Sequence, residues 1–462
     1  MSKRLILVLF LSPVLSSFGQ DMLFFETFLR AFEENHPAFK VSEANVNQYR
    51  ASLLASKGVF DPVLSYKSDN KTLTGDEYYN TQNPELKVQT PYALRLKAGN
   101  EYASGKYLNP HETPGNLTYL GLELPILKGL LMDGQRAARK QAELMVSQSA
   151  EEQRVMLNNM YLDAIEAYWT WASSFQNYEL LKEQGVNAQK RLKMTKLGFE
   201  NGAKSRADTV EAFLQVQNIN LLSQEAFIYL RKSTIALSVF LWDTDGNPYL
   251  LAESEKPQPM PQMLEAVALN EMVSLAKLNH PELKTYAFKL DGLAVERKLN
   301  RQSMLPTLDL KYNVLGKEYF NSEYAVNPYL ANNYKFGLDF KIPLFLREGR
   351  GKFAKTNFKI QETTFLQAQK SWTIENKVRQ YAVETNLLAE QLSTANQMAD
   401  GYRFLLRNEE LKFSQGESSL FLLISRENKL IDARQKIINV NLKYLKAYFK
   451  QRWAAGLLVT SN

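Results

Sequence analysis

The chain has 462 residues, a formal net charge of +7 and no cysteine. The lack of thiols excludes disulfides, thiolate metal sites, cysteine nucleophiles and a lipidated N-terminal cysteine. The positive charge is spread along the chain without a Lys/Arg-rich block, so nothing in it indicates nucleic-acid binding.

The N-terminus has the pattern of an export signal, which we place at residues 1–19. Two basic residues precede an apolar run from Leu5 to Leu15, and small residues follow before Gln20. After this segment, no stretch approaches the roughly 18 uncharged apolar residues that a membrane-spanning helix requires. If the exported chain enters a bilayer, we therefore expect it to do so as strands.

The rest of the chain contains an internal duplication. The motif Asn35-His36-Pro37 recurs 244 residues later as Asn279-His280-Pro281, and Pro62 recurs at the same distance as Pro306. In each copy we expect the asparagine to cap a helix and the proline to occupy its first turn, which makes the histidines cap residues rather than metal ligands. We divide the chain into a first repeat at residues 20–247, a proline-marked linker at 248–264 and a second repeat at 265–462.

Each repeat continues with segments of alternating polarity. Residues 334–342 alternate between apolar side chains such as Phe336 and polar ones such as Asp339, which predicts a strand with one apolar face. We expect such strands within about 62–126 and about 306–343. Strands of about nine to eleven residues can cross a membrane at a tilt, although a half-buried sheet of a soluble domain has the same pattern.

One length difference between the copies lies in this strand region. Pro62 and Pro125 are 63 residues apart, whereas Pro306 and Pro343 are 37 apart, so the first copy carries a 26-residue insertion. Its alternating residues fit an additional strand, a prolonged membrane strand or a long extracellular loop. We favour the last two, because an odd strand would leave an unpaired edge in lipid.

Proline-free stretches rich in helix-forming residues follow in both copies, and they predict long helical hairpins at about 133–242 and about 349–455. Apolar residues form heptad seams along them, and the first copy has two seams side by side, which indicates two neighbouring helices. At about 1.5 Å per residue, the first helix of each hairpin is roughly 100 Å long.

Both hairpins are expected to turn at the same motif, Phe-x-x-Gly-x-x-Ser. Its glycine supplies the turn, and its serine begins the returning helix. The motif residues are Phe199, Gly202 and Ser205 in the first copy and Phe413, Gly416 and Ser419 in the second.

Strand pairs that lead into two very long helical hairpins, in duplicate and behind an export signal, resemble the TolC-like outer-membrane efflux protein family. The resemblance covers essentially the whole exported chain. It implies a mixed α and β membrane protein that forms a homotrimer, with four strands per chain in a twelve-stranded transmembrane β-barrel continuous with a twelve-helix periplasmic α-barrel. Four strands are also too few to close a barrel alone, since about eight is the smallest closed size.

The resemblance further implies a location and partners. The protein would lie in the outer membrane and extend into the periplasm. It would work with a periplasmic adaptor, also called a membrane fusion protein, and with an inner-membrane RND or ABC transporter.

The family closes its tunnel at the hairpin tips, where acidic residues after the glycine motif surround the pore. In the first copy Asp208 and Glu211 lie six and nine residues after Gly202. In the second copy Leu422 and Ser425 lie at the same distances after Gly416. Asp208 also fits the third position of a capping box opened by Ser205, and both roles remain open. The residues implied as tip and adaptor contacts are Phe199, Gly202, Lys204, Ser205, Phe413, Gly416 and Ser419.

The function implied is a passive exit duct without a catalytic site or a cofactor. The chain has three histidines, no G-x-S-x-G and no H-E-x-x-H, so the usual hydrolase patterns are missing. The alternative is a non-channel periplasmic coiled-coil scaffold protein, which predicts polar residues on both strand faces.

Overall fold

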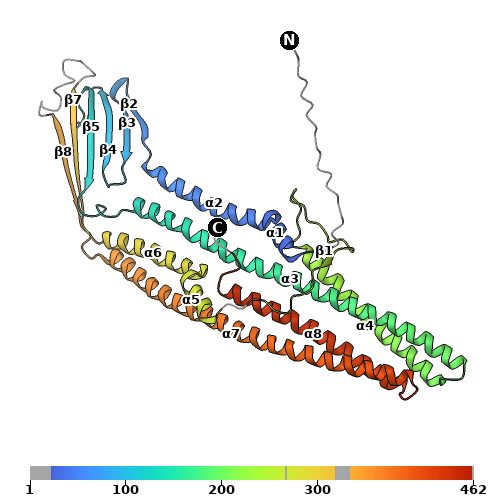
Figure 1. Ribbon diagram of the computed structural model, residues 1–462. Coiled ribbons are helices and arrows are strands. Elements are labelled where there is room, and N and C mark those ends of the chain that lie inside the picture. The colour runs from blue at the N-terminus through green and yellow to red at the C-terminus, as the bar shows by residue number, and fades with distance from the viewer. Residues whose placement is uncertain (1–21, 266–267, 318–332, 460–462) are drawn as a thin grey trace, which may run out of the picture. The chain divides into compact units, whose positions relative to one another are not determined.

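The computed structural model describes residues 22–265, 268–317 and 333–459, so the expected export signal lies outside them. Each half of the chain runs through helices, then strands, then two long helices (Figure 1). The chain forms two compact units, and each is built from both repeats. The helical unit comprises the described residues of Met1–Lys40, Leu157–Ala276 and Glu375–Asn462, and the sheet unit comprises those of Val41–Met156 and Lys277–Ile374.

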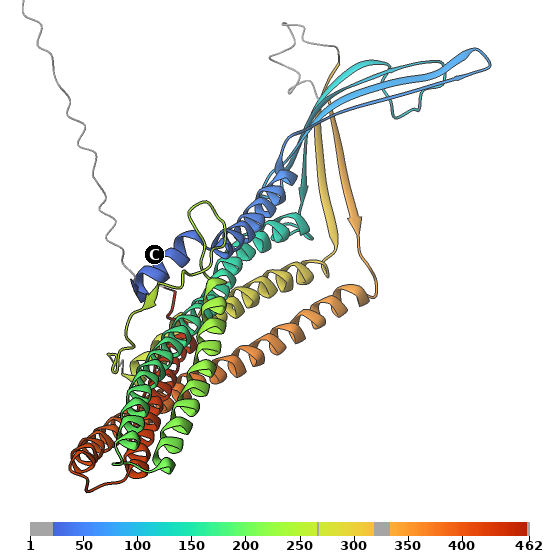
Figure 2. The same ribbon diagram turned by 90° about the vertical axis from the view of Figure 1, so that its right-hand side faces the viewer.

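The sheet unit contains an antiparallel sheet of six strands in the order β2-β3-β4-β5-β7-β8. Figure 2 shows the first two as a long hairpin. The strands are β2 (Val63–Leu73), β3 (Asp76–Gln89), β4 (Arg95–Ser104), β5 (Gly115–Pro125), β7 (Thr307–Lys317) and β8 (Tyr334–Lys341).

The six strands correct the expectation of four per chain. The insertion between Pro62 and Pro125 is neither a prolonged strand nor a long loop, because this region folds into four strands instead of two. Thr74 and Gly75, both with positive φ, turn β2 into β3, and Ala93 with φ +70° lies in the turn before β4. A single added strand would leave an unpaired edge, whereas the added pair is hydrogen-bonded on both sides within the sheet.

The polar face of the sheet ties the added strands to the others. Tyr119 on β5 reaches across β4, and its hydroxyl donates to Glu85 Oε2 on β3 at 2.8 Å. The ring passes over Gly99, where a Cβ would lie 2.6 Å from the Tyr119 hydroxyl. Two rows further on the same face, Arg95 on β4 forms an ion pair of 2.8 Å with Glu123 on β5.

Helices α2 (Pro37–Lys57) and α6 (Pro281–Gln302) lead into the strands, the first through a short 3-10 turn, η1 (Gly58–Phe60). Asn300 Nδ2 on α6 donates to Thr356 Oγ1 at 2.9 Å, which ties α6 to the second hairpin. In both copies the cap differs from the one we expected. His280 is the N-cap of α6, and its Nδ1 accepts from the Glu282 N–H at 3.2 Å; His36 Nδ1 accepts from Ala38 in the same way.

The physical reason for the histidine caps is the proline that follows them. A residue before proline is pushed to extended backbone, the conformation of an N-cap, so the histidine takes this position. The asparagines instead end the preceding helices, α1 (Phe25–Asn35) and α5 (Leu269–Asn279).

The two hairpins consist of α3 (Gly134–Glu200) with α4 (Arg206–Ser238) and of α7 (Arg347–Ser414) with α8 (Leu420–Ala454). Helices α3 and α7 have 67 and 68 residues, so each is roughly 100 Å long. No helix in the described part of the chain combines the length and the apolar composition needed to cross a membrane.

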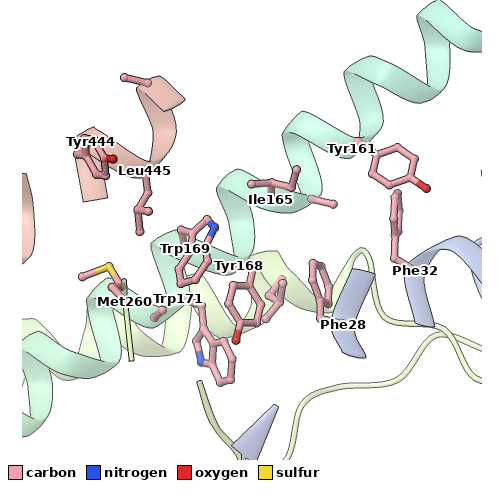
Figure 3. Close-up of a cluster of buried hydrophobic side chains, with 14 of the residues drawn as sticks. Phe28, Phe32, Tyr161, Ile165, Tyr168, Trp169, Trp171, Met260, Tyr444 and Leu445 are labelled. Carbon is pink, nitrogen blue, oxygen red and sulfur yellow. The ribbon is translucent and has the colours of Figure 1, made fainter. Parts of the chain in front are cut away.

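An aromatic core fills the helical unit where α1, α3 and α8 meet the residues after α4 (Figure 3). Tyr168 lies at its centre, fully buried, and packs edge-on against Trp169 and Trp171. Its hydroxyl donates to the Leu23 carbonyl at 2.6 Å and accepts from the Gln258 N–H at 3.3 Å. These bonds flank the short parallel pairing of β1 (Met22–Leu23) with β6 (Lys256–Pro257), which joins the N-terminus to the linker.

We predict that Tyr168→Phe lowers the free energy of unfolding by about 1–3 kcal/mol, because the partly buried Leu23 carbonyl and Gln258 amide lose a hydrogen-bonding partner. The matched control is Tyr229→Phe, since the Tyr229 side chain is 66% exposed. Thermal unfolding of the purified protein should shift for the first variant only. Equal thermal unfolding midpoints for the two variants would show that the Tyr168 hydroxyl does not stabilise the pairing of β1 with β6.

Candidate functional site at the hairpin tips

Both hairpins turn at the glycine expected from the sequence. Gly202 has φ +73° and Gly416 has φ +80°, the left-handed conformation that glycine adopts without steric cost. The Ala203 N–H donates to the Gly198 carbonyl at 2.8 Å, and the Glu417 N–H donates to the Lys412 carbonyl at 2.9 Å. These backbone bonds close the ends of α3 and α7 as Schellman-type turns.

The two tips of one chain lie against each other. The Lys204 ammonium lies 4.2 Å from the centre of the Phe413 ring, a cation–π contact between the first and the second tip. Behind it, Ala212 on α4 packs with Leu420 and Ile424 on α8, and Leu192 and Phe413 cover this small cluster. All four long helices therefore contribute to one apolar plug just inside the tips.

Asp208 forms the capping box that Ser205 opens. Its Oδ2 accepts from the Ser205 N–H at 2.9 Å and from the Ser205 hydroxyl at 2.8 Å, while its own N–H donates to Ser205 Oγ at 3.1 Å. These bonds, more than the nearby Lys204 charge, hold the pKa of Asp208 below its usual value. The stabilisation is present above the ordinary carboxyl pKa and is lost as pH falls through the lowered value, so Asp208 is charged at neutral pH.

Glu211 lies one turn further along α4, on the same side as Asp208, and is partly exposed. In the second tip, Ser419 also caps its helix by accepting from the Leu422 N–H at 3.3 Å. Leu422 stands where Asp208 stands in the first tip, so the second cap has no carboxylate. The remaining motif aromatic, Phe199, is 45% exposed at the end of α3.

Buried charges behind the tips were not found from the sequence. Glu427 on α8 is 5% exposed and forms an ion pair with Arg191 on α3, which joins the two hairpins. Glu409 on α7 accepts from the Ser418 hydroxyl at 2.6 Å, and Arg426 lies 3.8 Å from its carboxylate. Sequence spacing gives no signal for partners more than 200 residues apart, such as Arg191 and Glu427.

Replacing Gly202 or Gly416 with alanine should destabilise the tip by about 1 kcal/mol, because alanine is strained at positive φ. Neither site has an atom within 4 Å of an added Cβ, so crowding does not contribute. The same substitution at Gly401, inside α7 and equally open, is the matched control and should stabilise the protein by a similar amount through helix propensity. Thermal unfolding and protease cleavage at the tips measure the loss of stability at Gly202 and Gly416 and the gain at Gly401. If stability changed in the same direction for all three variants, the assignment of the turns would be wrong.

Comparison with known proteins agrees with this architecture. Residues 272–455 match the family model described as outer membrane efflux protein. The alkaline protease secretion protein AprF of Pseudomonas aeruginosa is 23% identical over 365 residues, which cover 77% of this chain and 72% of that protein.

Solved structures share the fold at low sequence identity. The CmeC outer membrane channel of Campylobacter jejuni superposes with a TM-score of 0.63 and 14% identity over 93% of this chain and 85% of that chain. The outer membrane protein VceC of Vibrio cholerae gives a TM-score of 0.63 and 11% identity over 93% and 95%. The second half of the chain therefore resembles the outer membrane efflux protein family, and the chain has the fold of solved outer-membrane channels.

Proposed function

We propose that three copies of this chain form a passive exit duct from the periplasm, through the outer membrane, to the exterior. An inner-membrane transporter of the RND or ABC type and a periplasmic adaptor would deliver the exported molecule to the hairpin tips. The duct itself would consume no energy and carry out no chemistry.

The observation that carries this proposal is an uncovered apolar seam on α4. Four large side chains on this helix are spaced by seven residues, and each is 53–61% exposed in the single chain. A strict heptad of this kind is the seam of a helix that packs against a neighbour. Since these side chains are exposed among the residues that the structure describes, we assign the seam to the next copy in a ring. Its residues are Leu214, Leu221, Ile228 and Ile235.

We place the constriction of the duct at Asp208 and Glu211. Three chains would bring up to six carboxylates into a narrow ring, where they would attract cations and repel anions. The capping bonds of Asp208 engage only its Oδ2, so capping and facing the pore are compatible.

Opening would separate the two hairpins of each chain at their tips. The contacts that hold them near the tips are the Lys204–Phe413 cation–π contact, the Arg191–Glu427 ion pair and a 2.7 Å hydrogen bond from Gln215 Nε2 to Asn428 Oδ1. The first lies outermost and is worth about 0.5–1 kcal/mol at an exposed site. It is therefore the contact most easily broken when an adaptor binds.

The charge of the constriction can be removed without removing its hydrogen-bond acceptors. In planar bilayers we expect Asp208→Asn with Glu211→Gln to shift the reversal potential under a salt gradient toward zero, because the fixed negative charge is gone. At about 1 M salt the difference from wild type should vanish, since the Debye length there is only about 3 Å. The control Glu225→Gln removes the same charge from the same side of α4, two heptads from Glu211, and should leave selectivity unchanged.

An unchanged reversal potential in the double variant would retire the acidic constriction but not the duct. A separate Asp208→Ala variant tests capping alone, which predicts a loss of about 1 kcal/mol of stability. A protein recovered only as a soluble monomer would overturn the duct itself.

The Lys204–Phe413 contact has its own test. We expect Lys204→Met to raise the fraction of time that the channel is open, because it removes the outermost contact between the hairpins. Lys182→Met is the matched control, since the Lys182 ammonium lies 5.8 Å from the Tyr178 ring on its own helix and joins no second element. Equal open times for the two variants would show that Lys204 does not hold the tips closed.

A further inference from the structure

We propose that all six strands of each chain enter the wall of the outer-membrane pore, and that β8 of one copy pairs with β2 of the next. This inference rests on the trimer of the proposed function. Three copies of six strands would then close a barrel of eighteen strands instead of the twelve that the family resemblance implies.

The first support is an apolar row that crosses the whole sheet without interruption. The register aligns Leu64 with Leu86, Leu86 with Ala98, Ala98 with Leu120, Leu120 with Val314 and Val314 with Tyr334, so every strand contributes one apolar side chain at the same level. Partners in such a row share one face of the sheet. The added strands β3 and β4 thus carry the same apolar band as β7 and β8.

This band is exposed on every strand of the single chain. Large side chains of this face are between 38% and 77% exposed, and a water-facing sheet would not display them together. The six examples, one from each strand, are Leu64, Leu86, Leu96, Leu120, Tyr312 and Phe336. Lipid is the solvent that this face fits.

The opposite face makes the added strands part of the same wall. Glu85 on β3 is held by Tyr119 on β5 across β4, and Arg95 on β4 pairs with Glu123 on β5. These polar contacts continue to β8, where Lys311 and Asp339 form an ion pair of 2.5 Å. A hairpin that projected into water on its own would not share a polar network with the membrane strands.

Only the distal part of the β2–β3 hairpin departs from the band. From Ser68 to Gln82 the side chains are polar on both faces, apart from Leu73 and tyrosines near the turn. We infer that this part extends beyond the lipid on the outer side, while the strand bases remain in the wall. Figure 2 shows the hairpin reaching past the turns of its neighbours within the sheet.

The two outer edges of the sheet fit each other. Every pairing in the sheet is antiparallel, so β2 and β8 run in opposite directions. Among the described residues neither outer edge has a partner strand, and unpaired backbone groups cannot face lipid. Pairing β8 with β2 of a second copy satisfies both edges. Because barrel width grows roughly linearly with strand number, the pore would be about 1.5 times as wide as one of twelve strands.

Cysteine cross-linking in native outer membranes tests the strand count, and the chain has no cysteine of its own to interfere. Leu338→Cys on β8 is combined with a cysteine at Leu64, Tyr66 or Ser68 on β2, all on the outward face. The matched set combines Leu338→Cys with a cysteine at Leu96, Ala98 or Asn100 on β4, which would be the neighbour of β8 if only four strands formed the wall. Single-cysteine variants control for random collisions.

We expect oxidation to produce covalent dimers and trimers on boiled, non-reducing gels for at least one β8–β2 pair and for no β8–β4 pair. Products from β8–β4 pairs, or no β8–β2 product in a protein that native gels show to be trimeric, would overturn the eighteen-stranded wall and leave the duct standing. A protein that is not trimeric on native gels would instead overturn the proposed function.

Discussion

A helix of roughly 100 Å must be covered along its whole apolar surface, because its own hydrogen bonds leave it only marginally stable in water. In this chain α8 covers α3 over many turns. The Trp453 indole donates to Asn159 Oδ1 at 2.7 Å, and Gln435 donates to Asn177 at 2.9 Å. Each chain thereby joins its two hairpins through α3 and α8, while the seam of α4 stays exposed in the single chain. The ring proposed above would cover this seam with another copy.

The features that the sequence predicted are those set by local signals. The turns at Gly202 and Gly416 follow from a glycine at the end of a long periodic helix, and the capping box of Asp208 follows from its spacing to Ser205. The number of strands was missed because alternating residues look the same in a prolonged strand and in an added pair. Only the pairing partners distinguish them, and these depend on contacts between distant segments.

The tips combine two kinds of interaction with different sensitivity to solvent. Beneath the surface, Ala212 and Leu420 pack in an apolar plug, and the Arg191–Glu427 pair is largely withdrawn from water. At the surface, the Lys204–Phe413 contact and the carboxylates of Asp208 and Glu211 remain accessible. Breaking a buried pair by removing one partner costs several kcal/mol, whereas exposed contacts cost little. The outer layer of the tips can therefore rearrange while the inner layer keeps the hairpins together.

The hydrogen bonds of the Tyr168 hydroxyl also constrain the order in which the chain can fold. Its hydroxyl needs the amide of Gln258, and the core around it includes Tyr444 and Leu445 from the last helix. The N-terminal strand thus cannot dock until the linker has emerged, and the core cannot close until the C-terminal helix arrives. A chain that lacks its last helix therefore lacks part of the core on which its first hairpin rests. Closure of this core is a late event that needs residues from both ends of the described chain.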